Sequence, residues 1–481
     1  MKQLSSFYGV MDAENHLKNR AMEAVNHSKN RAMEADTISK HGRSSKSHTS
    51  RRNFLKMASI TLLIVGFGIS VYAQNSNVTV TNWNVPEITL QTAGDLRAFR
   101  DRVNARNDFS GQTFTLSNDI NIESDNQWVP IGTIIGGDYN RTEIPFNGTF
   151  DGNGKVIKGV KISGNNSRQG LFGYLGAMGT IKNLGVVDVN IKGDTRVGGL
   201  VGSNSGIIEN CYVSGNVIIN GTEIVGGLVG VSVEGGRIEN CHASGNIGGK
   251  KQIGGLVGVN NSTIENCYTS GSVRGTETDA GGLVGQNNES IIKKCYATGN
   301  VTGKENVGGL VGSFSRGGMF MYSAGKAGTG KGAILNSYAT GNVTGDKNIG
   351  GLTGYIALNR IENCFATGNV KGNNNVGGLT GHSLGGTGKI TNCYSVGNVV
   401  GNDNLGGLVG NTDNQYNDAI TNCYYDTQKS EQFDARKGKP MATEDMKKQS
   451  TYSGWDFIRI WIINPDINDG LPYLRGVGIG K

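Results

Sequence analysis

The chain has 481 residues, and its composition excludes several classes of protein. Its 77 glycines lack the strict three-residue period of collagen, and six of the seven net positive charges lie in residues 1–73, so the remainder gives no indication of a nucleic-acid partner. None of the six prolines lies between residues 146 and 439, as expected for continuous strand ladders in which every backbone N–H is needed as a donor.

The first 73 residues are predicted to be a targeting region. Residues 1–49 are polar, lack an apolar face and are expected to be a disordered leader. Residues 50–73 combine a basic start, an apolar stretch and a small residue at the cleavage point, which is the pattern of an export signal. The start resembles the twin-arginine export signal at Arg51, Arg52, Phe54 and Leu55, although two arginines before an apolar run also suit general secretion.

Export determines the expected location of the protein. We expect cleavage after Ala73 and a mature chain that is secreted or held at the cell surface, in the periplasm or on the outer surface. If the signal is not cleaved, residues 57–73 are the part expected to contact a membrane. That stretch is short for a span of the bilayer.

Residues 74–195 are expected to contain a capping helix and the first β-coils. Thr92 is placed to cap a helix from Ala93 to about Val103, with Leu96 and Phe99 on its apolar face. Such a helix would cover the open edge of the first coil.

Residues 196–426 contain a phrase, Gly-Gly-Leu-Val/Thr-Gly, that occurs eight times. The copies begin 28, 28, 27, 27, 42, 27 and 29 residues apart, from Gly198 to Gly406, and each is followed by a phrase of the form Ile-x-Asn-Cys-Tyr-x-x-Gly-Asn-Val. This period and the short β-branched runs indicate stacked units built from strands. We therefore predict an all-β fold, a parallel β-helix or β-solenoid of about a dozen coils, with glycines at corners that need a positive φ.

The second phrase predicts a corner and a row of cysteines. Ile208 and Cys211 are three residues apart, so both face inward only if the chain turns at Asn210, and stacked Asn side chains could then bond along the rod. Stacked cysteines on parallel strands have poor geometry for disulfides, so we expect buried free thiols, with a disulfide framework as the alternative. The cysteines at this position are Cys211, Cys241, Cys267, Cys295, Cys364, Cys393 and Cys423.

Two further rows follow the same register. The residue after the cysteine position is usually Tyr, with His242 and Phe365 as substitutes. Facing outward, these rings would form a strip suited to sugars, but partial burial against the neighbouring coil is the preferred interpretation. The glutamates at Glu209 and its equivalents form a second row, for which a solvated strand face is preferred over an active site.

The 42-residue spacing predicts an insertion from Phe314 to Gly332. Insertions in solenoids form loops on one face, often the binding face, and this one combines aromatic, methionine and basic side chains. We take it as the candidate binding site, with a flexible loop that binds nothing as the alternative. Its candidate residues are Arg316, Met319, Phe320, Tyr322, Lys326 and Lys331.

Residues 427–481 are expected to cap the far end of the solenoid. Thr443 begins a short helix, and Trp455, Phe457, Trp461 and Tyr473 supply bulk to close the last coil.

The repeated phrases resemble the GLUG motif of bacterial secreted and surface proteins. Gly281 to Val301, with Gly-Gly-Leu-Val-Gly followed by Asn-Cys-Tyr-Ala-Thr-Gly-Asn-Val, carries the resemblance. It implies export and a repeat architecture. The family includes large adhesins, and also IgA-cleaving metallopeptidases in which the repeats are an accessory stalk.

No catalytic motif is found in the sequence. The His-Glu-x-x-His motif of zinc peptidases does not occur, no Cys-x-x-Cys pair is present, and only His242 and His382 follow the leader, so no metal or cofactor site is predicted. The expected function is non-catalytic: an adhesin-like scaffold that binds or displays extracellular glycans or surface proteins. A polysaccharide-degrading hydrolase or lyase and a purely structural stalk are the alternatives.

Overall fold

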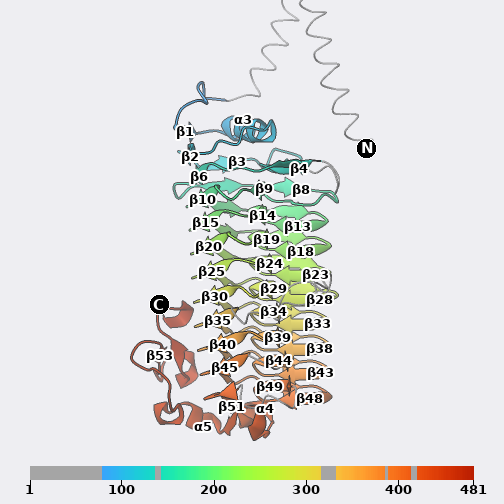
Figure 1. Cartoon of the computed structure of the whole chain (residues 1–481), viewed down its shortest axis with the longest axis vertical. Helices are drawn as coiled ribbons and strands as arrows, with labels where there is room; N and C mark the ends of the chain where they lie inside the picture. The colour runs from blue at the N-terminus through green and yellow to red at the C-terminus, as the bar shows by residue number, and fades with distance from the viewer. Residues whose placement is uncertain (1–77, 136–141, 316–331, 385–387, 413–419, 481) are drawn as a thin grey trace, which may run out of the picture. The chain divides into compact units, whose positions relative to one another are not determined.

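The computed structural model describes residues 78–135, 142–315, 332–384, 388–412 and 420–480, all within the compact unit Ser76–Lys481. The predicted fold is confirmed: short strands stack in parallel into a β-solenoid (Figure 1), and two of its columns contain 12 strands each. The leader and the export signal, with Arg51, Arg52, Phe54, Leu55 and Ala73, lie outside the described residues.

A complete coil contributes one strand to each of five columns, numbered here in chain order. Column 1 contains β13 (Thr195–Gly198), β18 (Glu223–Gly226), β23 (Lys251–Gly254), β28 (Thr278–Gly281), β33 (Glu305–Gly308), β38 (Lys347–Gly350), β43 (Asn374–Gly377) and β48 (Asp403–Gly406). Column 2 contains β9 (Phe172–Leu175), β14 (Val201–Asn204), β19 (Val229–Ser232), β24 (Val257–Asn260), β29 (Val284–Asn288), β34 (Val311–Ser315), β39 (Thr353–Ala357), β44 (Thr380–Leu384) and β49 (Val409–Thr412).

The remaining columns complete each coil. Column 3 contains β1 (Glu87–Leu90), β2 (Thr113–Leu116), β6 (Thr149–Asp151), β10 (Thr180–Lys182), β15 (Ile207–Glu209), β20 (Arg237–Glu239), β25 (Thr263–Glu265), β30 (Ile291–Lys293), β35 (Ala333–Leu335), β40 (Arg360–Glu362), β45 (Lys389–Thr391) and β50 (Ile420–Thr421). Column 4 contains β3 (Ile120–Asn121), β7 (Val156–Lys158), β11 (Gly185–Val187), β16 (Tyr212–Ser214), β21 (His242–Ala243), β26 (Tyr268–Thr269), β31 (Tyr296–Ala297), β36 (Tyr338–Ala339), β41 (Phe365–Ala366), β46 (Tyr394–Ser395), β51 (Tyr424–Asp426) and β52 (Lys439–Met441). Column 5 contains β8 (Lys161–Ile162), β12 (Asn190–Lys192), β17 (Ile218–Asn220), β22 (Asn246–Gly249), β27 (Val273–Gly275), β32 (Val301–Thr302), β37 (Val343–Thr344), β42 (Val370–Lys371) and β47 (Val399–Val400).

The glycines of the repeated phrase serve close packing, which corrects the expectation that they supply positive φ. Gly281, Gly282 and Gly285 have φ outside the left-handed region. A Cβ on any of the three would overlap backbone atoms of the same coil or of a neighbouring coil. Their hydrogen side chains therefore let columns 1 and 2 approach backbone to backbone.

The corner predicted in the second phrase is confirmed. Asn210 has a left-handed backbone with φ of 52°, and the side chains of Ile208 and Cys211 are both fully buried. The Asn210 amide donates to Asn183 Oδ1 in the preceding coil at 3.1 Å. Asn is favoured at such corners because its short polar side chain tolerates the left-handed conformation and bonds locally.

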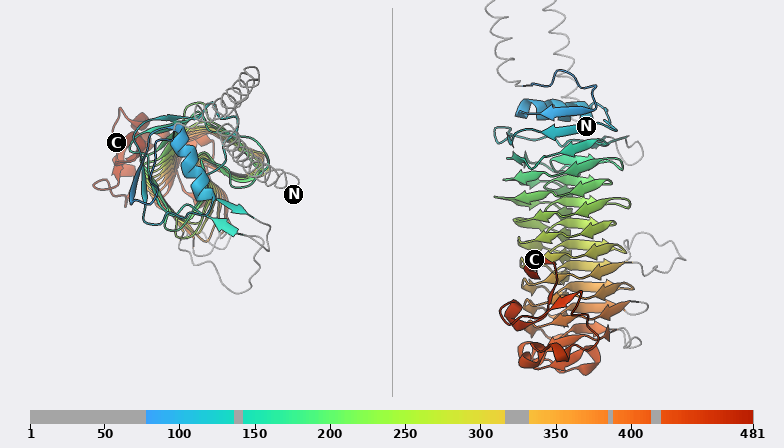
Figure 2. Two further views of the ribbon diagram at one scale, coloured as in Figure 1. Left: turned by 90° about the horizontal axis from the view of Figure 1, so that it is seen from above. Right: turned by 90° about the vertical axis from the view of Figure 1, so that its left-hand side faces the viewer.

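The N-terminal cap is also confirmed. Helix α3 (Ala93–Asn104) begins with a capping box in which Thr92 accepts from the Asp95 N–H. Leu96, Phe99 and Val103 are fully buried, and the helix lies across the open end of the coils (Figure 2). An antiparallel hairpin of β4 (Thr133–Ile135) and β5 (Thr142–Ile144) lies outside the five columns.

The C-terminal segment corrects the prediction for the far end. The last coil is closed by residues 427–441, which contain α4 (Thr427–Ser430), the 3₁₀ helix η2 (Ala435–Lys437) and β52. Residues 442–479, called here the C-terminal module, start at this end and then fold back along the side of the rod (Figure 1), where they pack against the aromatic residues of column 4. The module contains α5 (Thr443–Met446), η3 (Gln449–Thr451), β53 (Trp461–Ile462), η4 (Asn468–Gly470), β54 (Tyr473–Leu474) and the start of η5 (Gly478–Gly480). The prediction that a short helix begins at Thr443 is confirmed.

The described helices are short. None that the structure describes is long and apolar enough to cross a bilayer.

Candidate functional site

A groove of about 680 Å³ runs along the rod between columns 1 and 2. Four successive coils line it, and each gives one residue two positions before its Gly-Gly pair and one residue directly after the repeated phrase. The first row of the groove is Asp279, Asn306, Asn348 and Asn375. The second row is Gln286, Ser313, Tyr355 and His382.

The first row is a ladder of hydrogen-bonded side chains. Its four residues have left-handed backbones, with φ between 54° and 62°. The Asn306 amide donates to Asp279 Oδ1 at 2.9 Å, Asn348 donates to Asn306 at 2.8 Å, and Asn375 donates to Asn348 at 2.7 Å. All donors point toward the N-terminal end of the rod, so the carboxylate of Asp279 is the acceptor at the end of the ladder.

The surroundings of Asp279 alter its acidity. Burial raises the pKa of Asp279 to about 6, and the nearby carboxylate of Glu305 acts in the same direction. The hydrogen bond donated by Asn306 opposes both effects. Asp279 is therefore largely ionised at neutral pH, and its carboxylate can accept hydrogen bonds at the groove.

The second row belongs to strands in strict register. Gln286 pairs with Ser313, Ser313 with Tyr355, and Tyr355 with His382 as Cα partners along column 2. The Tyr355 and His382 rings meet edge to face, with centroids 5.5 Å apart. The row thus presents an amide, a hydroxyl, a phenol and an imidazole at one coil spacing, about 4.8 Å.

Charge in the groove is predominantly negative. Asp279, Glu289 and Glu305 line it together with one lysine, Lys347. The Lys347 ammonium lies 3.1 Å from Glu305 and neutralises that carboxylate. Carboxylates thus outnumber ammonium groups among the described residues that line the groove.

The groove ends at the coil of Asp279, although Gln252 of the preceding coil still donates a hydrogen bond to Gln286 Oε1. In the two preceding coils, the same positions hold Ile224 with Val231 and Gln252 with Val259. Both valines are 7% exposed. The strands of columns 1 and 2 continue through these coils. The groove therefore differs from the preceding coils in its side chains and not in its backbone.

A second outward feature is the aromatic row of column 4. Its rings stack from Tyr212 to Tyr394, with centroids 4.6 to 5.0 Å apart and interplanar angles of 2 to 6°. Since each ring covers the face of the next, the row presents ring edges to its surroundings. The row is thus partly buried against neighbouring coils, as the preferred interpretation expected, and the faces that a sugar would need are already in use.

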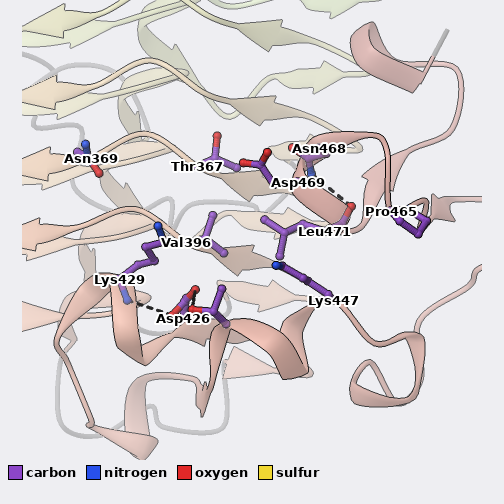
Figure 3. A pocket seen from close by; sticks show the side chains of 11 residues that line it. Thr367, Asn369, Val396, Asp426, Lys429, Lys447, Pro465, Asn468, Asp469 and Leu471 are labelled. Atoms are coloured by element: carbon purple, nitrogen blue, oxygen red, sulfur yellow. Dashed lines mark hydrogen bonds between the residues drawn. The ribbon is translucent and has the colours of Figure 1, made fainter.

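A cleft of about 580 Å³ lies where residues 426–441 and the C-terminal module meet the coils (Figure 3). Asp426 points into it, but its Oδ1 accepts from the N–H groups of Gln428 and Lys429, and its Oδ2 accepts from the Thr443 hydroxyl. This carboxylate caps α4 and joins it to α5. The cleft is therefore explained by the fold.

The cysteines form one buried row in the corner between columns 3 and 4. All seven, which lie within the described residues, are buried and carry free thiols. Cys241 Sγ accepts from the Cys211 N–H at 3.3 Å, and the Cys211 thiol donates to the Glu209 carbonyl at 3.2 Å. Burial raises the pKa of Cys423 well above its usual range, so this thiol stays protonated.

The structure changes the outline of the predicted insertion. Phe314 belongs to β34 and is fully buried, so the insertion begins after this strand and not at Phe314. The six predicted binding residues, from Arg316 to Lys331, lie outside the described residues. Within the described ranges no group of three His, Cys, Asp or Glu residues is placed to hold a metal ion.

Sequence reasoning missed the groove residues. The sequence pattern assigns no binding role to Asp279, Gln286, Tyr355 or His382. The sequence distinguishes them in one way. These positions vary from coil to coil, whereas the Gly-Gly-Leu phrase beside them is repeated.

Two relatives match short stretches of this chain. A stretch of 93 residues is 44% identical to Halomucin of Haloquadratum walsbyi, covering 19% of this chain and 1% of that protein. Another of 49 residues is 47% identical to a protein of Evansella cellulosilytica assigned as a Gly-rich membrane protein, covering 10% of this chain and 6% of that protein. The chain thus spans a small fraction of either relative.

One solved structure has a similar chain. It is a Bacteroides ovatus protein assigned to the immunoglobulin A1 proteases, with 20% identity and a TM-score of 0.37, and the match covers 80% of this chain and 91% of that one.

A family model matches the repeats. The model of the GLUG motif fits residues 193–218, 221–248, 250–274, 276–302 and 345–371. These ranges contain copies of the Gly-Gly-Leu phrase together with the corner that follows, so the motif corresponds to the coil that the glycines allow to pack. The chain thus carries GLUG-motif repeats at these five places.

Proposed function

We propose that this protein is exported and acts, without catalysis of its own, as an adhesin-like scaffold that binds or displays glycans or proteins outside the cell. The export-signal pattern of residues 50–73 supports the location. The observation that carries the binding role is the groove between columns 1 and 2, where polar and aromatic side chains follow the valines Val231 and Val259 of the two preceding coils in column 2.

A solenoid suits such a role because its backbone is rigid and its surface positions are independent. Each coil contacts only its neighbours, so a side chain on the outside can change without disturbing the stack. The rows at Asp279 and Gln286 use this freedom, whereas the glycines of the same coils do not vary and the cysteine position changes once, to Ser337.

The insertion remains part of the proposal. Ser315 lines the groove and is the last described residue before the insertion. Residues Arg316, Met319, Phe320, Tyr322, Lys326 and Lys331 are therefore proposed to add to binding at this side of the rod.

An array of glycans and extracellular-matrix proteins tests the proposed function. The purified protein is compared with a variant that lacks residues 316–331 and with heat-unfolded protein as the control. We expect saturable binding to at least one ligand by the folded protein. Folded protein that binds nothing on the array would contradict the binding role and leave a structural stalk.

A further inference from the structure

We propose that the groove between columns 1 and 2 binds a linear, uncharged glycan that lies along the rod, with about one sugar unit on each coil. This inference rests on the proposed function and narrows it to one ligand class and one site. The site comprises the first row (Asp279, Asn306, Asn348, Asn375) and the second row (Gln286, Ser313, Tyr355, His382).

The spacing of the rows favours a polysaccharide. Successive members of the second row are Cα partners on adjacent parallel strands, about 4.8 Å apart. An extended peptide advances about 3.3 Å per residue and therefore falls out of step with the coils. A sugar unit adds a length close to the coil spacing, so an extended glycan can repeat the same contacts on each coil.

The side chains match the hydrogen bonding of sugar hydroxyls. A hydroxyl group both donates and accepts, and it is best met by groups that offer acceptors and donors together. Asp279 offers a carboxylate acceptor, Gln286 the N–H donors of an amide whose oxygen accepts from Gln252, and Ser313 a hydroxyl, all lining the same wall of coils. Further along, Tyr355 and His382 add aromatic surface of the kind that packs against the apolar face of a sugar ring.

The charge of the groove selects against acidic glycans. Lys347, the one lysine among the lining residues, is paired with Glu305, so it offers an acidic ligand little attraction. A uronate or sulfate placed beside the carboxylate of Asp279 would be repelled, and the repulsion is strong where water is partly excluded. An uncharged chain meets no such cost.

The extent of the groove sets the length of the ligand. The residues that line the groove begin at Asp279, and the residues equivalent to Gln286 in the two preceding coils are Val231 and Val259. Four coils separated by about 4.8 Å span roughly 14 Å between the first and last, which corresponds to a segment of about four sugar units.

The test is a titration of the full protein with cellohexaose as the uncharged probe and with hexagalacturonate as the acidic probe. The binding-site variant is Gln286→Ala with Ser313→Ala. Its matched control is Ser203→Ala, at the equivalent position in an upstream coil that does not line the groove. Circular dichroism and thermal unfolding confirm that each variant is folded.

We expect cellohexaose to bind the wild type and the Ser203→Ala control equally, and the double variant about tenfold more weakly because two hydrogen bonds are lost. Hexagalacturonate should bind at least tenfold more weakly than cellohexaose. In Asp279→Asn, which removes one carboxylate and can continue the Asn ladder, this preference should shrink.

Several outcomes overturn the inference. Equal affinity of the double variant and the wild type for cellohexaose would move the site away from the groove. A preference for hexagalacturonate would reverse the charge argument. If neither sugar binds while the array shows a protein ligand, the inference fails and the proposed function stands; if nothing binds in either experiment, both fail.

Discussion

The aromatic row has two halves with the same stacking and different surroundings. In the upper half, Tyr212, His242, Tyr268 and Tyr296 are partly exposed. In the lower half, Tyr338, Phe365 and Tyr394 are at most 1% exposed, because the C-terminal module covers them. Ring spacings are 4.6 to 5.0 Å in both halves. The register of the coils therefore sets the stacking, and the module adds burial to rings that are already aligned.

The largest expected effect is in the covered half. Tyr394 is fully buried, its hydroxyl donates to the Pro472 carbonyl at 2.6 Å, and its ring contacts Trp461. Tyr394→Ala should lower the free energy of unfolding by about 3–5 kcal/mol, because it leaves a cavity and removes the hydrogen bond to Pro472. Urea unfolding followed by tryptophan fluorescence measures it. A loss below about 1 kcal/mol would mean that the module does not depend on this ring.

The next effect is at the upper end of the row. Gly185 is the Cα partner of Tyr212, and a Cβ at Gly185 would come 2.5 Å from Tyr212 Cζ. Gly185→Ala should therefore displace the first ring and cost about 1–3 kcal/mol by overpacking. Thermal unfolding checks this prediction, with Gly235→Ala as a comparison at a glycine that has open space but positive φ. An unchanged midpoint for Gly185→Ala would show that the upper ring moves freely.

A smaller loss is expected in the open half. Tyr268 stacks on His242 and Tyr296, but its edge is exposed. Tyr268→Ala should lower the free energy of unfolding by about 1–2 kcal/mol, since it removes two ring contacts but no contact with the C-terminal module. The measurement is the same urea unfolding as for Tyr394→Ala. Equal costs at the two positions would contradict the division of the row into halves.

The smallest effect depends on pH. Burial lowers the pKa of His242 below its ordinary value of 6.5. The unfolded state therefore binds the proton more readily, so the stability from His242 is present above pH 6.5 and is lost as the pH falls through the folded pKa. The substitution His242→Tyr should remove this loss, so the drop in melting temperature between neutral and mildly acidic pH should be smaller in the variant than in the wild type.

Asp279 changes the stability with pH in the opposite direction, and over a similar pH range. Its folded pKa of about 6 lies above the unfolded value of 3.8, so its proton stabilises the folded state at low pH and this contribution is lost as the pH rises through 6. The effect of His242→Tyr is therefore measured in an Asp279→Asn background. If the pH dependence in that background is the same with and without the His242→Tyr substitution, the assignment to His242 is wrong.

The stacked columns and the N-terminal cap could be predicted from the sequence because their signals are local or repeated. The phrase around Gly281 repeats the packing requirement in every coil, and Thr92 marks the start of α3 with its capping pattern. The position of the C-terminal module could not be predicted: Trp455 and Trp461 suit the end or the side of a solenoid equally, and contacts distant in sequence, such as Tyr394 with Pro472, decide between them.

The groove escaped prediction for a different reason. Asp279 and Gln286 are neighbours only because a Gly-Gly-Leu corner brings columns 1 and 2 together. In the sequence, the constant residues of the repeat are easy to recognise. The residues that differ between coils show no pattern until the structure places them along one groove.

The row of buried thiols has a consequence for the folding of the protein. Seven cysteines that are sealed in the folded coils are exposed together when the chain is unfolded. An odd number of thiols cannot all pair within one chain, so a molecule that meets an oxidant before its coils close is left with crosslinks or a reactive sulfur. If the chain is exported as proposed, closure of the coils before arrival in an oxidising medium would protect these thiols from crosslinking.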